Sequence, residues 1–166
     1  KLGPEHPTTA TTLSNLALLY ADQGRYADAE PLYKRVLAIF EKALGQEHPS
    51  TAVILDNLAG LYKDQGRYAE ALAYIRRAAS IVRKRLVLAG MRKTEGLKNE
   101  KSQYRWTFQA HTDLALHPSQ EGDRPVLEGE AFEALQLGRV SSTGNAIRRM
   151  AARFASGSGD VTSLVR

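Results

Sequence analysis

Apolar residues recur every three or four positions along most of this chain, which is the spacing of amphipathic α-helices. Two short stripes of this kind contain Leu13, Leu16, Ala17 and Tyr20, and then Leu55, Leu58, Ala59 and Tyr62. A turn and a second apolar stripe follow each of them, over residues 26–40 and 68–82. The pattern predicts an all-α protein whose helices come in pairs, and we expect no strand.

The two helix pairs are copies of one unit. Residues 2–7 recur as residues 44–49, and residues 22–27 recur as residues 64–69, both at an interval of 42 residues. Gly24 and Gly66 stand where the first helix of each unit must end, a place that favours a left-handed backbone. Pro7 and Pro49 stand at helix starts, where a missing N–H has no effect. Residues 1–43 and 44–86 are therefore two repeats, each burying a face that it could not bury alone.

These repeats resemble the tetratricopeptide repeat (TPR). The matching residues are Leu16-Ala17-x2-Tyr20 with Ala29-x3-Tyr33, and Leu58-Ala59-x2-Tyr62 with Ala71-x3-Ile75. The 42-residue period is similar to that of the longer repeats of kinesin light chains and many bacterial proteins. Ala17 and Ala59 depart from the glycine of the family, and Ile75 departs from its aromatic residue. The resemblance implies a right-handed α-solenoid of stacked antiparallel helix pairs that binds other proteins.

The period is lost after Leu86. We predict a linker over residues 87–98 and additional TPR-like or capping helices over residues 97–166. The apolar spacing favours one helix over 99–116, a loop over 117–125, and a long helix over 126–154 that Ser141–Gly144 kinks or divides. A further helix opens at Val161. Because two repeats are fewer than a stack normally needs, we expect residues 97–156 to cover the open face of the helix over 68–88.

Part of this second half has a narrower resemblance. Residues 129–139 and 150–155 are similar to the helical segment that precedes a caspase-like CHAT domain in bacterial TPR proteins. In that family a His and a Cys of the downstream domain carry the catalysis. The resemblance implies a further domain after residue 166 and gives an alternative function, that of a regulatory or sensor arm of a bacterial caspase-like protease.

A candidate binding site lies on the first helix of each repeat. Asn15 and Asn57 share one repeat position, away from the apolar stripe. In the family that these repeats resemble, an Asn at this place clamps the backbone of an extended peptide, because an amide is both donor and acceptor. The alternative is that both amides only bond to neighbouring helices. The other candidate residues of this concave groove are Ser14, Leu18, Asp56, Gly60 and Lys63.

A basic run gives a second alternative, the binding of nucleic acid over residues 76–93. It consists of Arg76, Arg77, Arg83, Lys84, Arg85, Arg92 and Lys93. We favour a solvated helix face instead, because no aromatic residues alternate with these cations. Tyr104, Trp106 and Phe108 are expected in the core, although three aromatics so close on one helix cannot all face one way, so one of them is a candidate for exposure.

Composition narrows the remaining chemistry. The chain has 166 residues, a net charge of +5 and no cysteine, which excludes disulfides and thiol catalysis within it. His6 and His48 precede the helix-starting prolines and are interpreted as caps, and His111 and His117 lack the spacing of zinc ligands. We therefore expect no metal, no cofactor and no enzyme. Without a signal peptide or a membrane span, a cytoplasmic location is expected. The expected partner is another protein or peptide, or another domain of the same full-length chain.

Overall fold

The described helices follow one another as antiparallel pairs. The computed structural model describes residues 3–91, 104–118, 120 and 124–138. The pairs are α1 (Pro7–Asp22) with α2 (Tyr26–Ala43), α3 (Pro49–Asp64) with α4 (Tyr68–Met91), and α6 (Arg105–Ala115) with α7 (Arg124–Gly138). These residues contain helices and turns but no strand. The all-α class and the paired helices are therefore confirmed.

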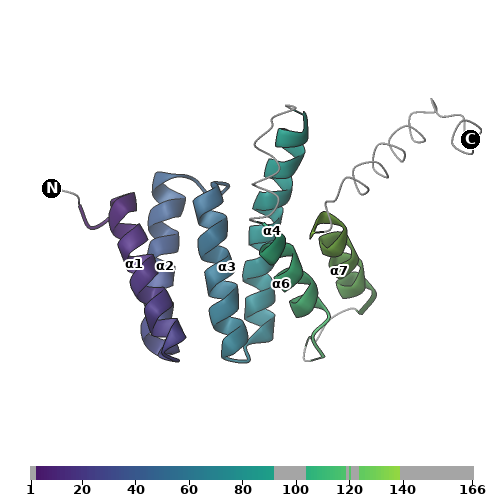
Figure 1. Ribbon diagram of the computed structural model, residues 1–166, viewed down its shortest axis with the longest axis horizontal. Coiled ribbons are helices and arrows are strands. Elements are labelled where there is room, and N and C mark those ends of the chain that lie inside the picture. Colours follow the sequence, from purple (N-terminus) through teal and green to yellow (C-terminus); the bar gives the residue numbers. More distant parts are fainter. Residues whose placement is uncertain (1–2, 92–103, 119, 121–123, 139–166) are drawn as a thin grey trace, which may run out of the picture.

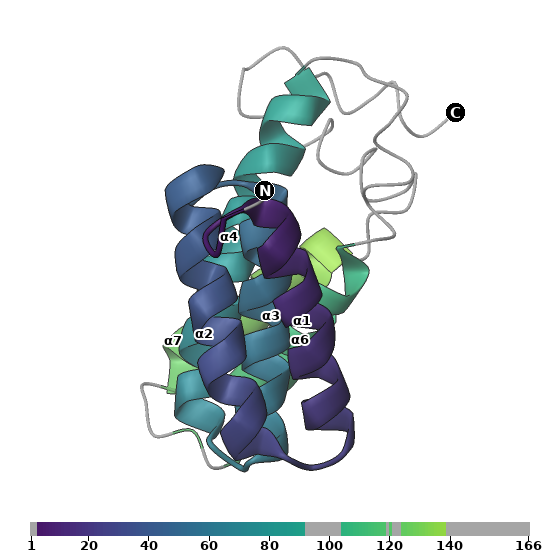
Figure 2. The same ribbon diagram turned by 90° about the vertical axis from the view of Figure 1, so that its left-hand side faces the viewer.

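The pairs stack side by side in chain order, as in a solenoid (Figure 1). Seen along the row, α1, α3 and α6 lie in one layer and α2, α4 and α7 in the other (Figure 2). Each second helix contacts the first helix of the next pair, α2 against α3 and α4 against α6. The first helices therefore share one side of the stack, which is where the candidate residues on α1 and α3 are found.

The repeated residues at the helix ends act as the sequence predicts. Nδ1 of His6 accepts a hydrogen bond from the backbone N–H of Thr8 at 3.2 Å, and Nδ1 of His48 accepts one from Ser50 at 3.1 Å. Each histidine is thus the N-cap of a helix that begins with proline. Gly24 and Gly66 end the first helices with φ angles of 72° and 73°. The left-handed backbone expected at these glycines is confirmed.

The core runs through the layers and is densest around the second repeat. Leu55, Leu58, Ala59 and Tyr62 of α3 are all buried. Ala17 and Ala59 are inaccessible too, as suits small residues between closely packed helices. One predicted core residue behaves differently: Leu16 of α1 is 37% exposed, because no helix in the described residues covers its side of α1. The apolar stripe of the first helix is therefore fully buried in the second repeat and only partly buried in the first.

The third pair closes the other end of the second repeat. α6 packs on α4 and α7 packs on α6, so residues after the repeats do cover the open face of α4, as expected. The loop that follows α6 is tied to the start of α4 as well. The ring of His117 stacks on Tyr68 with centroids 3.6 Å apart, and the side-chain amide of Gln120 donates to the carbonyl of Tyr68 at 2.9 Å.

Several predicted boundaries were wrong. The linker does not begin at residue 87, since α4 continues to Met91 through helix-favouring residues such as Leu88 and Ala89. Residues 105–115 of the predicted helix over 99–116 form α6. α7 begins at Arg124 instead of residue 126, because Pro125 suits the first turn of a helix. Residues 92–103 and 139–166, with the predicted division at Ser141–Gly144, lie outside the described residues.

Candidate functional site

The two candidate asparagines lie at equivalent places on neighbouring first helices. Asn15 of α1 is exposed and Asn57 of α3 is half-buried. Neither side chain has a hydrogen-bond partner within the described residues, so the bonds to neighbouring helices that were the alternative are not found there. Their amides are thus available to a ligand, and each offers a donor and an acceptor.

Four other candidate residues lie on the same two helices. Leu18 is 49% exposed, and Gly60 at the same repeat position leaves open space where a Cβ would stand. Lys63 is exposed and Ser14 is half-buried. A ligand lying across α1 and α3 would therefore meet an apolar side chain on the first helix and accessible backbone on the second.

Asp56 does not belong to this exposed set. Its Oδ2 accepts a hydrogen bond of 2.6 Å from the hydroxyl of Thr107 on α6, and its Oδ1 is buried without a partner. Burial raises the pKa of Asp56 to about 7, against a smaller lowering by the Thr107 hydroxyl. Asp56 is therefore a contact between α3 and α6, and it acts on the position of α6 instead of contacting a ligand directly.

The structure shows which of the three aromatics at α6 is exposed. Tyr104, Trp106 and Phe108 were expected in the core with one of them a candidate for exposure, and that one is Trp106, which is 52% exposed while Tyr104 and Phe108 are buried. The spacing explains the difference, because residues four apart share a helix face and the residue between them points the opposite way. Trp106 is next to Thr107, whose bond to Asp56 joins α6 to α3. Trp106 is therefore an accessible aromatic side chain on α6.

The basic run is mostly engaged in ion pairs between helices. Arg76 contacts Glu130 and Arg83 contacts Glu133, each at 2.8 Å, which ties α4 to α7. On the other side of α4, Arg77 contacts Glu41 at 2.6 Å and Lys84 contacts Glu47. Arg85 also has an interaction partner. Arg92 and Lys93 lie outside the described residues.

These pairs change what the basic run can do. Each of the four described cations with a named partner faces one carboxylate, so most of the local positive charge is neutralised within the fold. A nucleic-acid backbone would have to displace these carboxylates before it could bind the cations. The free energy of binding gained from counterion release would therefore be smaller. The pairs are solvent-exposed and individually weak, but together they brace α4 against both neighbouring pairs.

His111 adds a buried titratable group beside this brace. It lies on α6, and its Nε2 is 3.5 Å from Glu130, too long for a good hydrogen bond. Burial lowers the pKa of His111 below its usual range, although the nearby carboxylate of Glu130 acts in the opposite direction. The side chain is therefore held neutral near pH 7 and fills the contact between α6 and its neighbours.

In the part of the chain that the structure describes, no three His, Asp or Glu side chains lie close enough together to hold a metal ion. No described helix combines the length and the apolar character that crossing a membrane requires.

The comparisons with known proteins agree with the repeat pattern. Residues 8–84 match the tetratricopeptide repeat family, and this match spans both sequence repeats. Residues 8–84 are therefore identified as tetratricopeptide repeats. The match covers α1 to α4 up to Lys84 and leaves α6 and α7 outside it.

One similar solved structure is a crystal structure of nearly identical TPR-like repeats of a Podosopora anserina protein assigned as a kinesin light chain. It is 20% identical, the alignment covers 96% of this chain and 82% of that chain, and the TM-score is 0.47. Among curated proteins none matches this chain. The family assignment therefore depends on the repeats themselves.

Proposed function

We propose that this TPR protein is a binding scaffold, and that the layer of first helices (α1, α3 and α6) receives an extended peptide of a partner protein or of another domain of its own chain. Tetratricopeptide repeats generally mediate interactions between proteins. The observation that supports a site on this layer is the pair Asn15 and Asn57, two unpartnered amides at one repeat position. Such amides can bond to the N–H and C=O groups of a peptide backbone.

The neighbouring residues favour a partly apolar peptide. Leu18 and Trp106 offer exposed apolar surface on α1 and α6, and Gly60 allows close approach between them. Two repeats and one further pair give a short contact surface. We therefore expect affinities in the micromolar range for an isolated peptide.

The proposal is tested with a peptide selected from a random library on the full 166-residue chain. Replacing both Asn15 and Asn57 with Ala should weaken its binding by about tenfold, since each lost hydrogen bond is worth about 1 kcal/mol or less. Fluorescence polarisation gives the dissociation constants. The melting temperature should not change, because neither amide has a partner within the described fold.

Gln23 and Gln46 supply the matched control. Both are exposed polar residues outside the candidate face, and changing both to Ala should leave the affinity unaltered. Equal affinity of the Asn15→Ala/Asn57→Ala variant and the unmodified chain would refute the clamp. If the affinity of the selected peptides is also unchanged by Leu18→Ala and by Trp106→Ala, the peptide binds elsewhere on the protein.

The CHAT resemblance remains a hypothesis from sequence. Only residues 129–138 of the resembling segments lie in the described structure, in α7. Sequencing the gene beyond residue 166 would test it directly, because a regulatory arm requires a downstream domain that contains a His and a Cys.

A further inference from the structure

The contact between α3 and α6 contains a carboxyl group with a single polar partner. Oδ2 of Asp56 accepts a hydrogen bond of 2.6 Å from the hydroxyl of Thr107, which is 1% exposed. Oδ1 of Asp56 is buried and has no hydrogen-bond partner in the described residues. The carboxyl group is therefore enclosed between two first helices, with one uncharged donor bonded to it.

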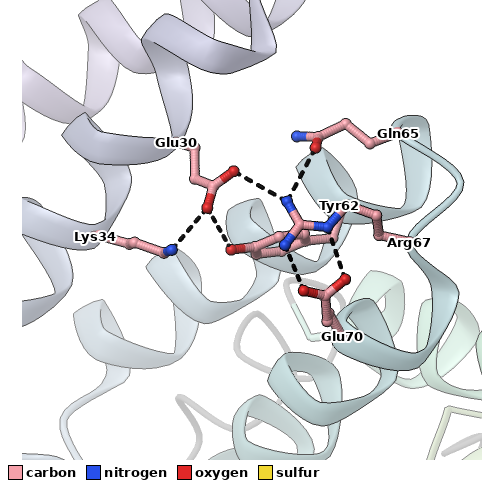
Figure 3. Close-up of polar contacts among 6 residues, drawn as sticks. All are labelled: Glu30, Lys34, Tyr62, Gln65, Arg67 and Glu70. Atoms are coloured by element: carbon pink, nitrogen blue, oxygen red, sulfur yellow. Dashed lines mark hydrogen bonds and ion pairs between the residues drawn. The ribbon is translucent and has the colours of Figure 1, made fainter.

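Glu30 shows what surrounds an ionised carboxylate at another helix contact of this fold (Figure 3). It lies on α2 and accepts hydrogen bonds from the hydroxyl of Tyr62 at 2.7 Å and from the guanidinium of Arg67 at 3.2 Å. The ammonium group of Lys34 is 2.7 Å from the same carboxylate. The hydrogen bonds from Lys34 and then Tyr62 are the largest causes that lower the pKa of Glu30, against the effect of burial. Glu30 is therefore ionised between helices, with two cations in contact.

The charged side chains of the helices around Asp56 have other partners or are exposed. Those with another partner on α4 and α6 are Glu70, Arg76, Arg77, Arg83, Lys84, Arg85 and His111. Those that are exposed are Asp22 of α1, Lys63 and Asp64 of α3, and Arg105 and Asp113 of α6. Burial raises the pKa of Asp56, and the opposing cause is the hydroxyl of Thr107. No charge on these described side chains therefore decides whether Asp56 is ionised.

Ionisation of Asp56 and docking of α6 on α3 therefore oppose each other. A buried negative charge with one neutral hydroxyl in place of water is unfavourable, whereas a neutral carboxyl group is tolerated in such a site. Water can hydrate the charge only if α6 moves away from α3. Because the docked arrangement favours the neutral form, protonation of Asp56 must in turn favour the docked arrangement.

We propose that Asp56 and Thr107 form a pH-sensitive latch between α3 and α6. The neutral carboxyl group bonds to Thr107 and keeps α6 docked on α3, and loss of its proton favours an open form in which α6 separates from α3. Trp106 is next to Thr107 on α6, so this exposed aromatic side chain moves with the helix. The latch goes beyond the binding function proposed above, and it can be tested without a peptide.

Amide hydrogen exchange of the 166-residue chain tests the latch. With a pKa of about 7 for Asp56 in the docked form and 3.8 for a hydrated aspartate, the equilibrium constant for opening should rise about tenfold between pH 6 and pH 8. After correction for the intrinsic pH dependence of exchange, the amides of α6 should lose protection by this factor. The amides of α1 and α2 should change by less than about twofold, because they lie outside the latch.

Two variants remove the titrating group but keep a polar side chain. Asp56→Asn retains an acceptor for Thr107, and Asp56→Ser introduces the residue type of Ser14, which has the same position in the first repeat. In both variants the protection of α6 should differ by less than about twofold between pH 6 and pH 8. Asp22→Asn, which removes an exposed carboxylate of α1, is the control and should retain the change of about tenfold. His111 is present in every chain, so its own titration cancels in these comparisons.

Three results would overturn the latch. One is a protection of α6 in the unmodified chain that is the same at pH 6 and pH 8. Another is a loss of protection that persists in Asp56→Asn and in Asp56→Ser, since a different group would then titrate. The third is an equal loss of protection in α1, α2 and α6, since Asp56 would then act on the unfolding of the whole chain and not on the docking of α6.

Discussion

α1 and α3 have the same pattern of apolar residues, the same caps and the same glycine stop, and they form helices of the same length. Their surroundings differ, because among the described helices α3 packs against both α2 and α4, whereas α1 packs mainly against α2. The local pattern decides that a helix forms, and the number of neighbours decides how much of its apolar stripe is buried. A residue's contribution to stability in this repeat protein therefore depends on its place in the row.

Removing the third helix pair should have the largest effect on stability. It would leave α4 of the second repeat uncovered, as α1 of the first repeat is uncovered in the described structure. Deletion of residues 91–166 takes away α6 and α7 and exposes the face of α4 that packs on α6. We expect loss of a cooperative thermal transition, because each repeat depends on its neighbour for a buried core. Circular dichroism would show it. A sharp, cooperative melt of residues 1–90 would contradict this prediction.

A paired leucine truncation measures the comparison directly. Leu58→Ala removes side-chain volume from a fully buried site in α3 and should lower the free energy of unfolding by about 2–4 kcal/mol. Leu16→Ala makes the same change at the equivalent but more exposed site of α1 and should lower it by less than about 1 kcal/mol. Urea denaturation of both variants gives the two values. Equal losses would mean that α1 is covered in solution.

The same repeat position is uncharged in the first repeat, as Ser14, and titratable in the second, as Asp56. The pKa of Asp56 is about 7 in the folded chain and near 3.8 when unfolded, so between these values the folded state binds more protons. The contribution of Asp56 to stability is therefore greatest below about pH 4 and falls as the pH rises to 7. Asp56→Asn keeps an acceptor for Thr107 and should raise the unfolding free energy at pH 8 on the order of 2 kcal/mol, with little change at pH 4.

Asp22→Asn changes an exposed carboxylate at the end of α1 and serves as the control for this measurement. It should alter the unfolding free energy by less than about 0.5 kcal/mol at either pH. The pKa of His111 is shifted downward, so the contribution of His111 to stability is lost as the pH falls below about 6.5. Every variant contains His111, so this contribution cancels when variants are compared at the same pH. If Asp56→Asn raises the unfolding free energy by the same amount at pH 4 and at pH 8, the raised pKa of Asp56 is contradicted.

The smallest effect concerns Tyr20 and Tyr62, which occupy the same repeat position. Tyr62→Phe removes the hydrogen bond to Glu30 and should lower the unfolding free energy by about 1 kcal/mol. Tyr20→Phe removes a hydroxyl without a partner in the described residues and should change it by less than about 0.3 kcal/mol. Thermal and urea unfolding of the two variants would resolve the difference. A loss for Tyr20→Phe equal to that for Tyr62→Phe would show that Tyr20 already has a partner.

The helix positions of the candidate residues could be predicted from sequence, but not the burial and contacts of each one. The repeat placed Asn15 and Asn57 on equivalent helix positions, and the structure describes them there. The sequence could not show that Asp56 faces α6, because that contact joins residues 51 positions apart that belong to no common repeat. The same holds for the basic run, whose carboxylate partners come from α2, the α2–α3 turn and α7.

Helix existence, helix ends and the repeat were decided by the sequence itself, since they depend on residues within one or two turns of each other. His48 with Pro49 starts a helix and Gly66 stops one wherever the unit stands in the row. Burial was decided by the tertiary structure, because solvent leaves an apolar side chain only when another helix covers it. Leu16 and Leu58 occupy the same place in the same motif, but among the described helices α3 packs against both α2 and α4, whereas α1 packs mainly against α2, and this accounts for the difference between them.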